Sequence, residues 1–151
     1  MANYAIVLYN GKNRQEYDTS IFSGDNTKCS PPGNFPVLEY DNILQNGSGG
    51  GDGLALVDAG GEVIEFISYE GSFTAIDGPA NGKTSVNIDV YERSGTSIGL
   101  SLQLVGDGCS RSDFTWRQDS APSSVGAVND GQEIVCEPSR DNEFSLNYNE
   151  L

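Results

Sequence analysis

The alternation of apolar and polar residues predicts a chain built from short β-strands. Two apolar runs, Leu54–Val57 and Val63–Tyr69, flank the turn-forming residues Asp58-Ala-Gly-Gly61, and this arrangement predicts a β-hairpin. Both runs place apolar residues on both faces, which is typical of strands in the middle of a sheet. We therefore expect this hairpin at the centre of the fold.

Other stretches predict strands on either side of the central hairpin. Tyr4–Tyr9 and Gln15–Ile21 flank Asn10-Gly11, which favours a type I′ turn and a first hairpin. Alternating apolar residues predict two half-buried strands, with inward faces formed by Val86, Ile88 and Val90 in one and by Leu100, Leu102 and Leu104 in the other. Shorter strands are expected at 37–40, 133–136 and 144–148. Trp116, the only tryptophan, is expected to close one end of the core.

The loops and the length of the chain define the fold class. Turn residues rich in Gly, Pro, Ser and Asn separate the predicted strands at 23–36, 45–53, 70–82 and 120–132. No window shows a helical period, so we expect no α-helix. Many short strands in 151 residues predict one all-β domain, most simply a two-layer β-sandwich over residues 1–137. Residues 138–151 form a tail that contains the strand signal at 144–148.

The charge excludes several classes of partner. Eight Lys and Arg against 22 Asp and Glu give a net charge of -14, which repels nucleic acid and anionic lipid. No stretch reaches transmembrane length, so membrane insertion is not expected, and no signal peptide is visible in the chain. The acidity indicates either a solubility device or a role for cations, calcium above all.

The chain has no histidine, which excludes zinc hydrolysis with histidine ligands and Ser/His catalysis. We expect no catalytic residue and no enzyme activity. Asp58 and Glu62 could form a carboxylate pair, but no cleft is implied beside them, so we expect a solvated turn. Several tyrosines could either form a carbohydrate-binding face or lie singly at outward and rim positions, namely Tyr9, Tyr17, Tyr40, Tyr69 and Tyr91.

Four Asp-Gly pairs supply the candidate metal ligands. They begin at Asp52, Asp77, Asp107 and Asp130. Carboxylates on a bendable backbone suit calcium, but Asp-Gly is also common turn chemistry, and no spacing matches a known calcium loop. The sequence therefore predicts no required cofactor and leaves calcium as an alternative.

Three cysteines and one sequon are candidates for covalent modification. Cys29, Cys109 and Cys136 allow one internal disulfide, for which we expect Cys29 with Cys109 in an oxidising compartment. Asn46-Gly47-Ser48 is a glycosylation sequon, meaningful if the source is a secreting eukaryote.

Several segments, in order, resemble the lamin tail domain family of bacterial and other extracellular proteins. The segments are Tyr4–Asn10, Gly51–Gly71, Phe73–Gly82, Gly99–Leu104, Asp113–Trp116 and Ala121–Gly131, the last with Val125 where proline is usual. The resemblance implies an immunoglobulin-like β-sandwich without catalytic residues. It also implies an extracellular module that works by surface contact with proteins.

The resemblance has one departure, because such domains usually begin with a further hairpin before the strand matched by Tyr4–Asn10. A sandwich without that hairpin leaves a sheet edge unpaired. Three explanations remain open: the chain is truncated, the tail around 144–148 fills the gap, or another subunit donates a strand. We expect an adhesive or structural module that assembles by strand addition. The alternative is an accessory targeting module of a larger secreted hydrolase.

Overall fold

The computed structural model describes residues 2–24, 51–90 and 95–135. Ten strands occur in these ranges: β1 (Ala2–Asn10), β2 (Gln15–Gly24), β3 (Gly53–Val57), β4 (Val63–Ser68), β5 (Val86–Asn87), β6 (Leu100–Ser101), β7 (Leu104–Gly108), β8 (Thr115–Trp116), β9 (Ala121–Pro122) and β10 (Gln132–Ile134). A short 3-10 helix, η1, spans Arg111–Asp113, and the described residues contain no α-helix. The expectation of an all-β fold is confirmed. The strands predicted at 37–40 and 144–148 lie outside the described residues.

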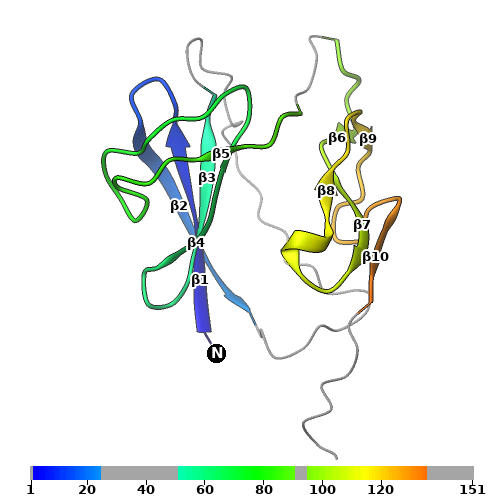
Figure 1. Cartoon of the computed structure of the whole chain (residues 1–151), viewed down its shortest axis with the longest axis horizontal. Coiled ribbons are helices and arrows are strands. Elements are labelled where there is room, and N and C mark those ends of the chain that lie inside the picture. The colour runs from blue at the N-terminus through cyan, green and yellow to red at the C-terminus, as the bar shows by residue number, and fades with distance from the viewer. Residues whose placement is uncertain (1, 25–50, 91–94, 136–151) are drawn as a thin grey trace, which may run out of the picture.

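The strands form three sheets. The largest has five strands in the order β2-β1-β3-β4-β5, and the others have the orders β10-β7-β8 and β6-β9. Figure 1 shows the five-stranded sheet as one group and β6 to β10 as a second group beside it. The predicted central hairpin is confirmed, because β3 and β4 pair antiparallel and β3 is the middle strand of five.

Two antiparallel pairs in the large sheet contain a bulge. Leu56 pairs with Glu65 and Val57 with Val63, so Ile64 is the extra residue and is 55% exposed. The prediction that β4 is buried on both faces is therefore wrong at this end. Between β1 and β2, Tyr17 is the extra residue, since Leu8 pairs with Asp18 and Tyr9 with Glu16.

The first hairpin forms as predicted, but its turn differs. The loop closes with a hydrogen bond from Arg14 N to Asn10 O of 2.7 Å, and Arg14, not Gly11, has a positive φ of 64°. A four-residue loop therefore replaces the expected two-residue type I′ turn. Asn10 stabilises it, because its side-chain oxygen accepts from the amides of Lys12 and Asn13.

The core lies between one face of the five-stranded sheet and the connection from β4 to β5. Buried residues of the sheet pack against buried residues of this connection in one cluster: Val7, Tyr9, Ala55, Val57, Phe66, Phe73, Ala75 and Ala80. The Phe66 ring contacts both Tyr9, with centroids 5.2 Å apart, and Phe73, at 5.4 Å and edge-on. Gly53 permits this packing, because a Cβ there would lie 3.2 Å from the Phe73 ring and 2.6 Å from Ile67 O.

Tyr9 also joins the sheet to the connection through its hydroxyl. The ring is fully buried, its oxygen accepts from Ala80 N at 3.0 Å, and it donates to Asp77 O at 3.4 Å. Burial raises the pKa of the Tyr9 phenol; the Ala80 amide opposes this change, and the nearby Glu16 and Asp77 carboxylates add to it. The expectation of an outward or rim position for Tyr9 is therefore wrong.

The two alternating segments predicted as half-buried strands differ most from expectation. Val86 is 67% exposed, and β5 has only two residues, paired parallel to β4. The run from Leu100 to Leu104 breaks into β6 and β7, and its leucines are only half-buried, whereas Gln103 between them is buried. The inward face predicted from the leucines is wrong, because Gln103 is the buried side chain of this run and makes the hydrogen bonds described below.

We expect Tyr9→Phe to lower the free energy of unfolding by about 1–3 kcal/mol, because it leaves the buried Ala80 N–H without an acceptor while keeping the ring. Urea denaturation of both proteins measures the difference. An unchanged denaturation midpoint would contradict a stabilising role for the hydroxyl.

Candidate functional site

The residues proposed for acid-base chemistry form a turn. Asp58 Oδ1 accepts from the amides of Gly60 and Glu62, both at 2.8 Å, and Asp58 N donates to Glu62 O at 2.9 Å. The Asp58 carboxylate thus stabilises the β3–β4 hairpin turn. This geometry supports the solvated-turn interpretation of Asp58 and Glu62.

The four Asp-Gly candidates for calcium lie in separate environments. Asp77 Oδ1 accepts from Glu16 N at 2.8 Å, Asp130 pairs with Arg117 at 3.6 Å, and Asp107 lies on β7. Within the described ranges, no group of three or more acidic or cysteine side chains is placed to hold a metal ion. Asp77 and Asp130 thus each have a partner within the protein, and so has Asp52, which is described next.

Asp52 is buried at the start of β3. Its Oδ1 accepts from Gly11 N at 2.9 Å, and its carbonyl accepts from Tyr69 N at 3.2 Å, so it links the first hairpin to the end of β4. Burial raises the pKa of the Asp52 carboxyl, and the Gly11 amide partly offsets this change.

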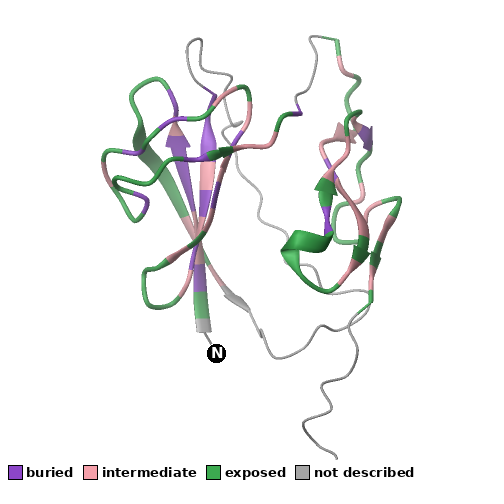
Figure 2. Ribbon diagram, in the orientation of Figure 1, coloured by how far each residue is buried: buried purple, intermediate pink, exposed green. Residues whose placement is uncertain are grey.

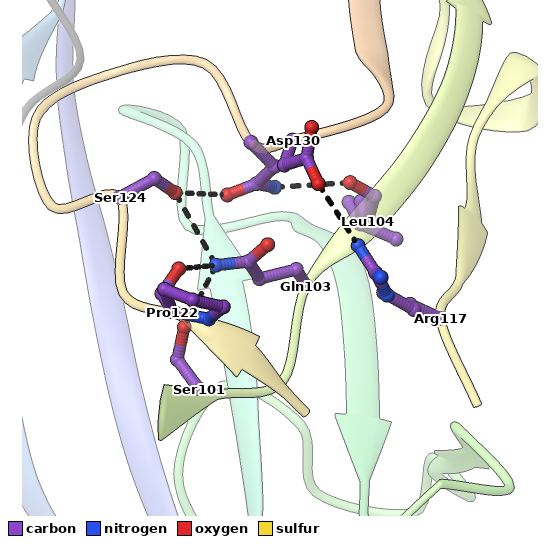
Figure 3. Close-up of polar contacts among 8 residues, drawn as sticks. Ser101, Gln103, Leu104, Arg117, Pro122, Ser124 and Asp130 are labelled. Atoms are coloured by element: carbon purple, nitrogen blue, oxygen red, sulfur yellow. Dashed lines mark hydrogen bonds and ion pairs between the residues drawn. The ribbon is translucent and has the colours of Figure 1, made fainter. Parts of the chain in front are cut away.

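Gln103 is the centre of a polar network that the sequence did not indicate. Figure 3 shows its amide nitrogen donating to Ser101 Oγ, Pro122 O and Ser124 Oγ, at 3.1, 2.8 and 3.4 Å. Ser124 Oγ donates to Asn129 Oδ1 at 2.6 Å, and Asn129 Nδ2 donates to Leu104 O at 3.0 Å. The network therefore holds the 121–131 loop against β7.

Two buried side-chain atoms, Gln103 Oε1 and Trp116 Nε1, have no hydrogen-bond partner among the residues that the structure describes. Trp116 is half-buried, and the neighbouring Phe114 is the aromatic residue buried in this part of the chain. The expectation that Trp116 closes one end of the core is not supported by its half-buried position.

The outer strand β2 provides the candidate interaction surface. Within the described part of the chain, β2 pairs only with β1, at Ala2↔Gly24 through Asn10↔Gln15. Its first half carries Glu16 and Asp18 and the bulge at Tyr17, which are features that discourage further pairing. Its second half, Thr19–Gly24, has no charge, no proline and no bulge, and Ile21 there is 72% exposed. We call Thr19–Gly24 the edge segment.

The second group of strands contacts the large sheet at a charged pair. Arg111 Nε donates to Glu65 Oε1 at 2.9 Å. Glu65 is the cross-strand partner of Leu56, so the Arg111–Glu65 ion pair lies on the sheet face that carries Leu56.

No helix in the described ranges is long and apolar enough to span a membrane.

Comparison of the chain with protein-family models, with characterised proteins and with solved structures found no match. The candidate surface therefore rests on the geometry of the chain itself.

Cys29, Cys136 and Asn46 lie outside the described residues, as do Tyr40 and Tyr91. Of the other tyrosines, Tyr17 is 43% exposed and Tyr69 is half-buried.

We expect Asp52→Asn to change the pH dependence of stability. The ordinary carboxyl pKa is 3.8, and folding raises it, so the folded chain holds the proton more tightly than the unfolded chain. In the wild type, stability therefore falls as the pH rises from about 3.8 through the raised pKa. The substituted amide keeps an acceptor for Gly11 N and does not ionise, so the variant should gain stability relative to wild type as the pH rises from about 3.8 through the raised pKa.

Urea denaturation across this pH range measures the effect of replacing Asp52. Asp52→Ala serves as the contrast, because it removes the acceptor and should cost about 1–3 kcal/mol near neutral pH. An Asp52→Asn variant with the pH profile of the wild type would show that the buried carboxyl does not control this dependence.

We expect Gln103→Glu to lower the free energy of unfolding by about 3 kcal/mol or more at neutral pH. It replaces a donor that faces three acceptors with a buried, charged acceptor. Gln118→Glu makes the same change at an exposed position and should stay within about 0.5 kcal/mol of wild type. Equal losses in the two variants, measured by urea denaturation, would contradict the role of the network.

Proposed function

We propose that this chain is a non-catalytic, extracellular structural or adhesive module that binds copies of itself by β-strand addition. The observation that carries the proposal is the edge segment of β2. An edge strand presents a row of backbone N–H and C=O groups to any strand of suitable length and shape. Six residues extend over about 20 Å, which is enough to pair with a full strand.

The distribution of charge along the chain supports pairing at this edge. With a net charge of -14, two copies repel each other over most of their surfaces. The edge segment Thr19–Gly24 is uncharged, and so is the segment Phe144-Ser-Leu-Asn-Tyr148 in the tail. Pairing between these two segments brings no like charges directly opposite each other.

The tail segment has the pattern expected of an added strand. Phe144, Leu146 and Tyr148 alternate with Ser145 and Asn147, which gives one apolar and one polar face. Ile21 offers apolar surface at the edge segment, since its side chain is 72% exposed. In this proposal, the tail of one copy pairs with β2 of the next and completes a lamin-tail-type, immunoglobulin-like sandwich.

We expect the wild type to form concentration-dependent oligomers, and Ile21→Lys to shift it toward the monomer, because lysine on an edge strand opposes further pairing. Ile98→Lys is the matched control: it adds the same charge at another exposed isoleucine and should leave assembly unchanged. Light scattering coupled to size-exclusion chromatography gives the mass of each species.

Removal of residues 138–151 tests the donor strand. The shortened chain should be monomeric and should bind a peptide of residues 138–151 with a stoichiometry of one to one. The proposal fails if the wild type is a folded monomer at all accessible concentrations, or if deletion of the tail leaves the oligomer unchanged.

A further inference from the structure

The loop of the first hairpin holds the pair Asn10-Gly11 in a specific set of hydrogen bonds. Gly11 N donates to Oδ1 of the buried Asp52 at 2.9 Å. The side-chain oxygen of Asn10 accepts from Lys12 N at 3.0 Å and from Asn13 N at 3.3 Å. A carboxylate therefore faces the Gly11 nitrogen, and two N–H donors face the Asn10 side-chain oxygen.

An asparagine followed by glycine can react with its own backbone. The nitrogen of the following residue attacks the side-chain carbonyl carbon, Cγ, and closes a five-membered succinimide ring within the chain. Glycine favours this attack, because it has no side chain to hinder the approach. The reaction is slow without help, since the nitrogen must lose its proton and the oxygen must carry the negative charge that develops on it.

Asp52 is placed to take the proton from Gly11. Its Oδ1 already accepts the Gly11 N–H, so the proton has a direct path to the carboxylate. Burial raises the pKa of the Asp52 carboxyl, which makes its carboxylate a stronger base than an exposed one. The Gly11 backbone is buried as well, so little water competes for this contact.

The amides of Lys12 and Asn13 are placed to stabilise the negative charge on the Asn10 oxygen. The loop holds them in position, because Arg14 N donates to Asn10 O at 2.7 Å and closes the turn. Asn10 is half-buried, and Figure 2 shows the rest of this loop, residues 12–14, in green as exposed. Ammonia can therefore leave the loop and water can enter it.

A second Asn-Gly pair in the described residues lacks such a base. Gly82 N, after Asn81, donates to Ala75 O at 2.9 Å. A backbone carbonyl accepts a hydrogen bond but does not take up the proton at neutral pH. Asn81 and Gly82 are both exposed, so solvent access does not hinder reaction there. The two pairs thus differ in the group that faces the glycine nitrogen.

We propose that Asn10 is a self-modification site, at which Asp52 and the amides of Lys12 and Asn13 promote its conversion to aspartate and isoaspartate. The Gly11 N–Cγ bond forms as the Gly11 proton passes to Asp52. The bond from Cγ to the side-chain nitrogen then breaks, and that nitrogen takes the proton from Asp52 and leaves as ammonia. Water opens the succinimide at either carbonyl.

The products change the loop between β1 and β2. Either product replaces a neutral amide with a carboxylate close to the buried Asp52, and isoaspartate also lengthens the backbone by one methylene. Like charges at this position oppose the closed loop. The reaction is a slow, one-way change in the loop that leads into β2, and it does not depend on the assembly proposed above.

Mass spectrometry of the aged full-length chain tests the reaction. The folded protein is incubated at neutral pH and digested with trypsin at mildly acidic pH, where further deamidation is slow. Cleavage after Lys12, Lys28 and Lys83 places Asn10 in peptide 1–12 and Asn81 in peptide 29–83. We expect conversion at Asn10 to be about tenfold or more faster than at Asn81, and faster than at Asn10 in protein unfolded by urea. A folded chain that converts Asn10 no faster than the unfolded chain overturns the proposal.

Two variants separate the base from the fold. Asp52→Asn keeps an acceptor for Gly11 N but accepts no proton, so it should slow conversion at Asn10 about tenfold or more in the folded chain. It should leave the rate in urea unchanged. Peptide 29–83 reports any reaction of the new Asn-Gly pair at position 52 separately. Asp58→Asn is the matched control, because it removes a carboxylate that accepts amides in the β3–β4 turn and should keep the wild-type rate at Asn10. A wild-type rate in Asp52→Asn, or an equal loss in both variants, contradicts the role of Asp52.

Discussion

The packing of the 69–85 connection onto the large sheet is the contact on which the described core depends. Phe73, Ala75 and Ala80 cover the sheet face that carries Tyr9 and Phe66, and the Tyr9 hydroxyl binds the connection again at Ala80 N. The same connection leads the chain from β4 to the parallel strand β5. Loss of this contact would expose an apolar sheet face and separate β5 from its neighbour, so the order β2-β1-β3-β4-β5 depends on it.

Outside this core, the fold relies more on polar links. The second group of strands has few buried side chains, and its order depends on Gln103 with its hydrogen-bond partners and on Asp113 at the β7 turn. A chain with a net charge of -14 gains little from surface ion pairs, and only two occur in the described residues. The same charge opposes self-association least at uncharged backbone edges, which are the surfaces that the proposed strand addition uses.

The sequence predicted the strands whose pattern depends on local residues alone. The hairpins around Gly11 and around Asp58–Gly61 formed as expected, because a turn signal lay between two strand-length runs. The prediction is wrong at Leu100–Leu104, where the alternation predicts that Gln103 faces outward. Gln103 is buried because its amide meets acceptors from Ser101, Pro122 and Ser124, and the last two are about 20 residues away in the chain. No local pattern contains that information. An unpaired sheet edge was expected only as a consequence of the missing first hairpin, and its location at β2 depended on the pairing of strands far apart in the chain.

The sequence is sufficient to predict the all-β class, the central hairpin, the lack of histidine chemistry and the strong negative charge. These properties follow from composition and from alternation over a few residues. The tertiary structure alone decided that Tyr9 and Asp52 are buried, that β5 and β10 pair in parallel and that β2 lies at the edge of the sheet. Each of these depends on contacts between residues far apart in the chain, whose free energy is set by mutual packing and hydrogen bonding and not by the preference of any single segment.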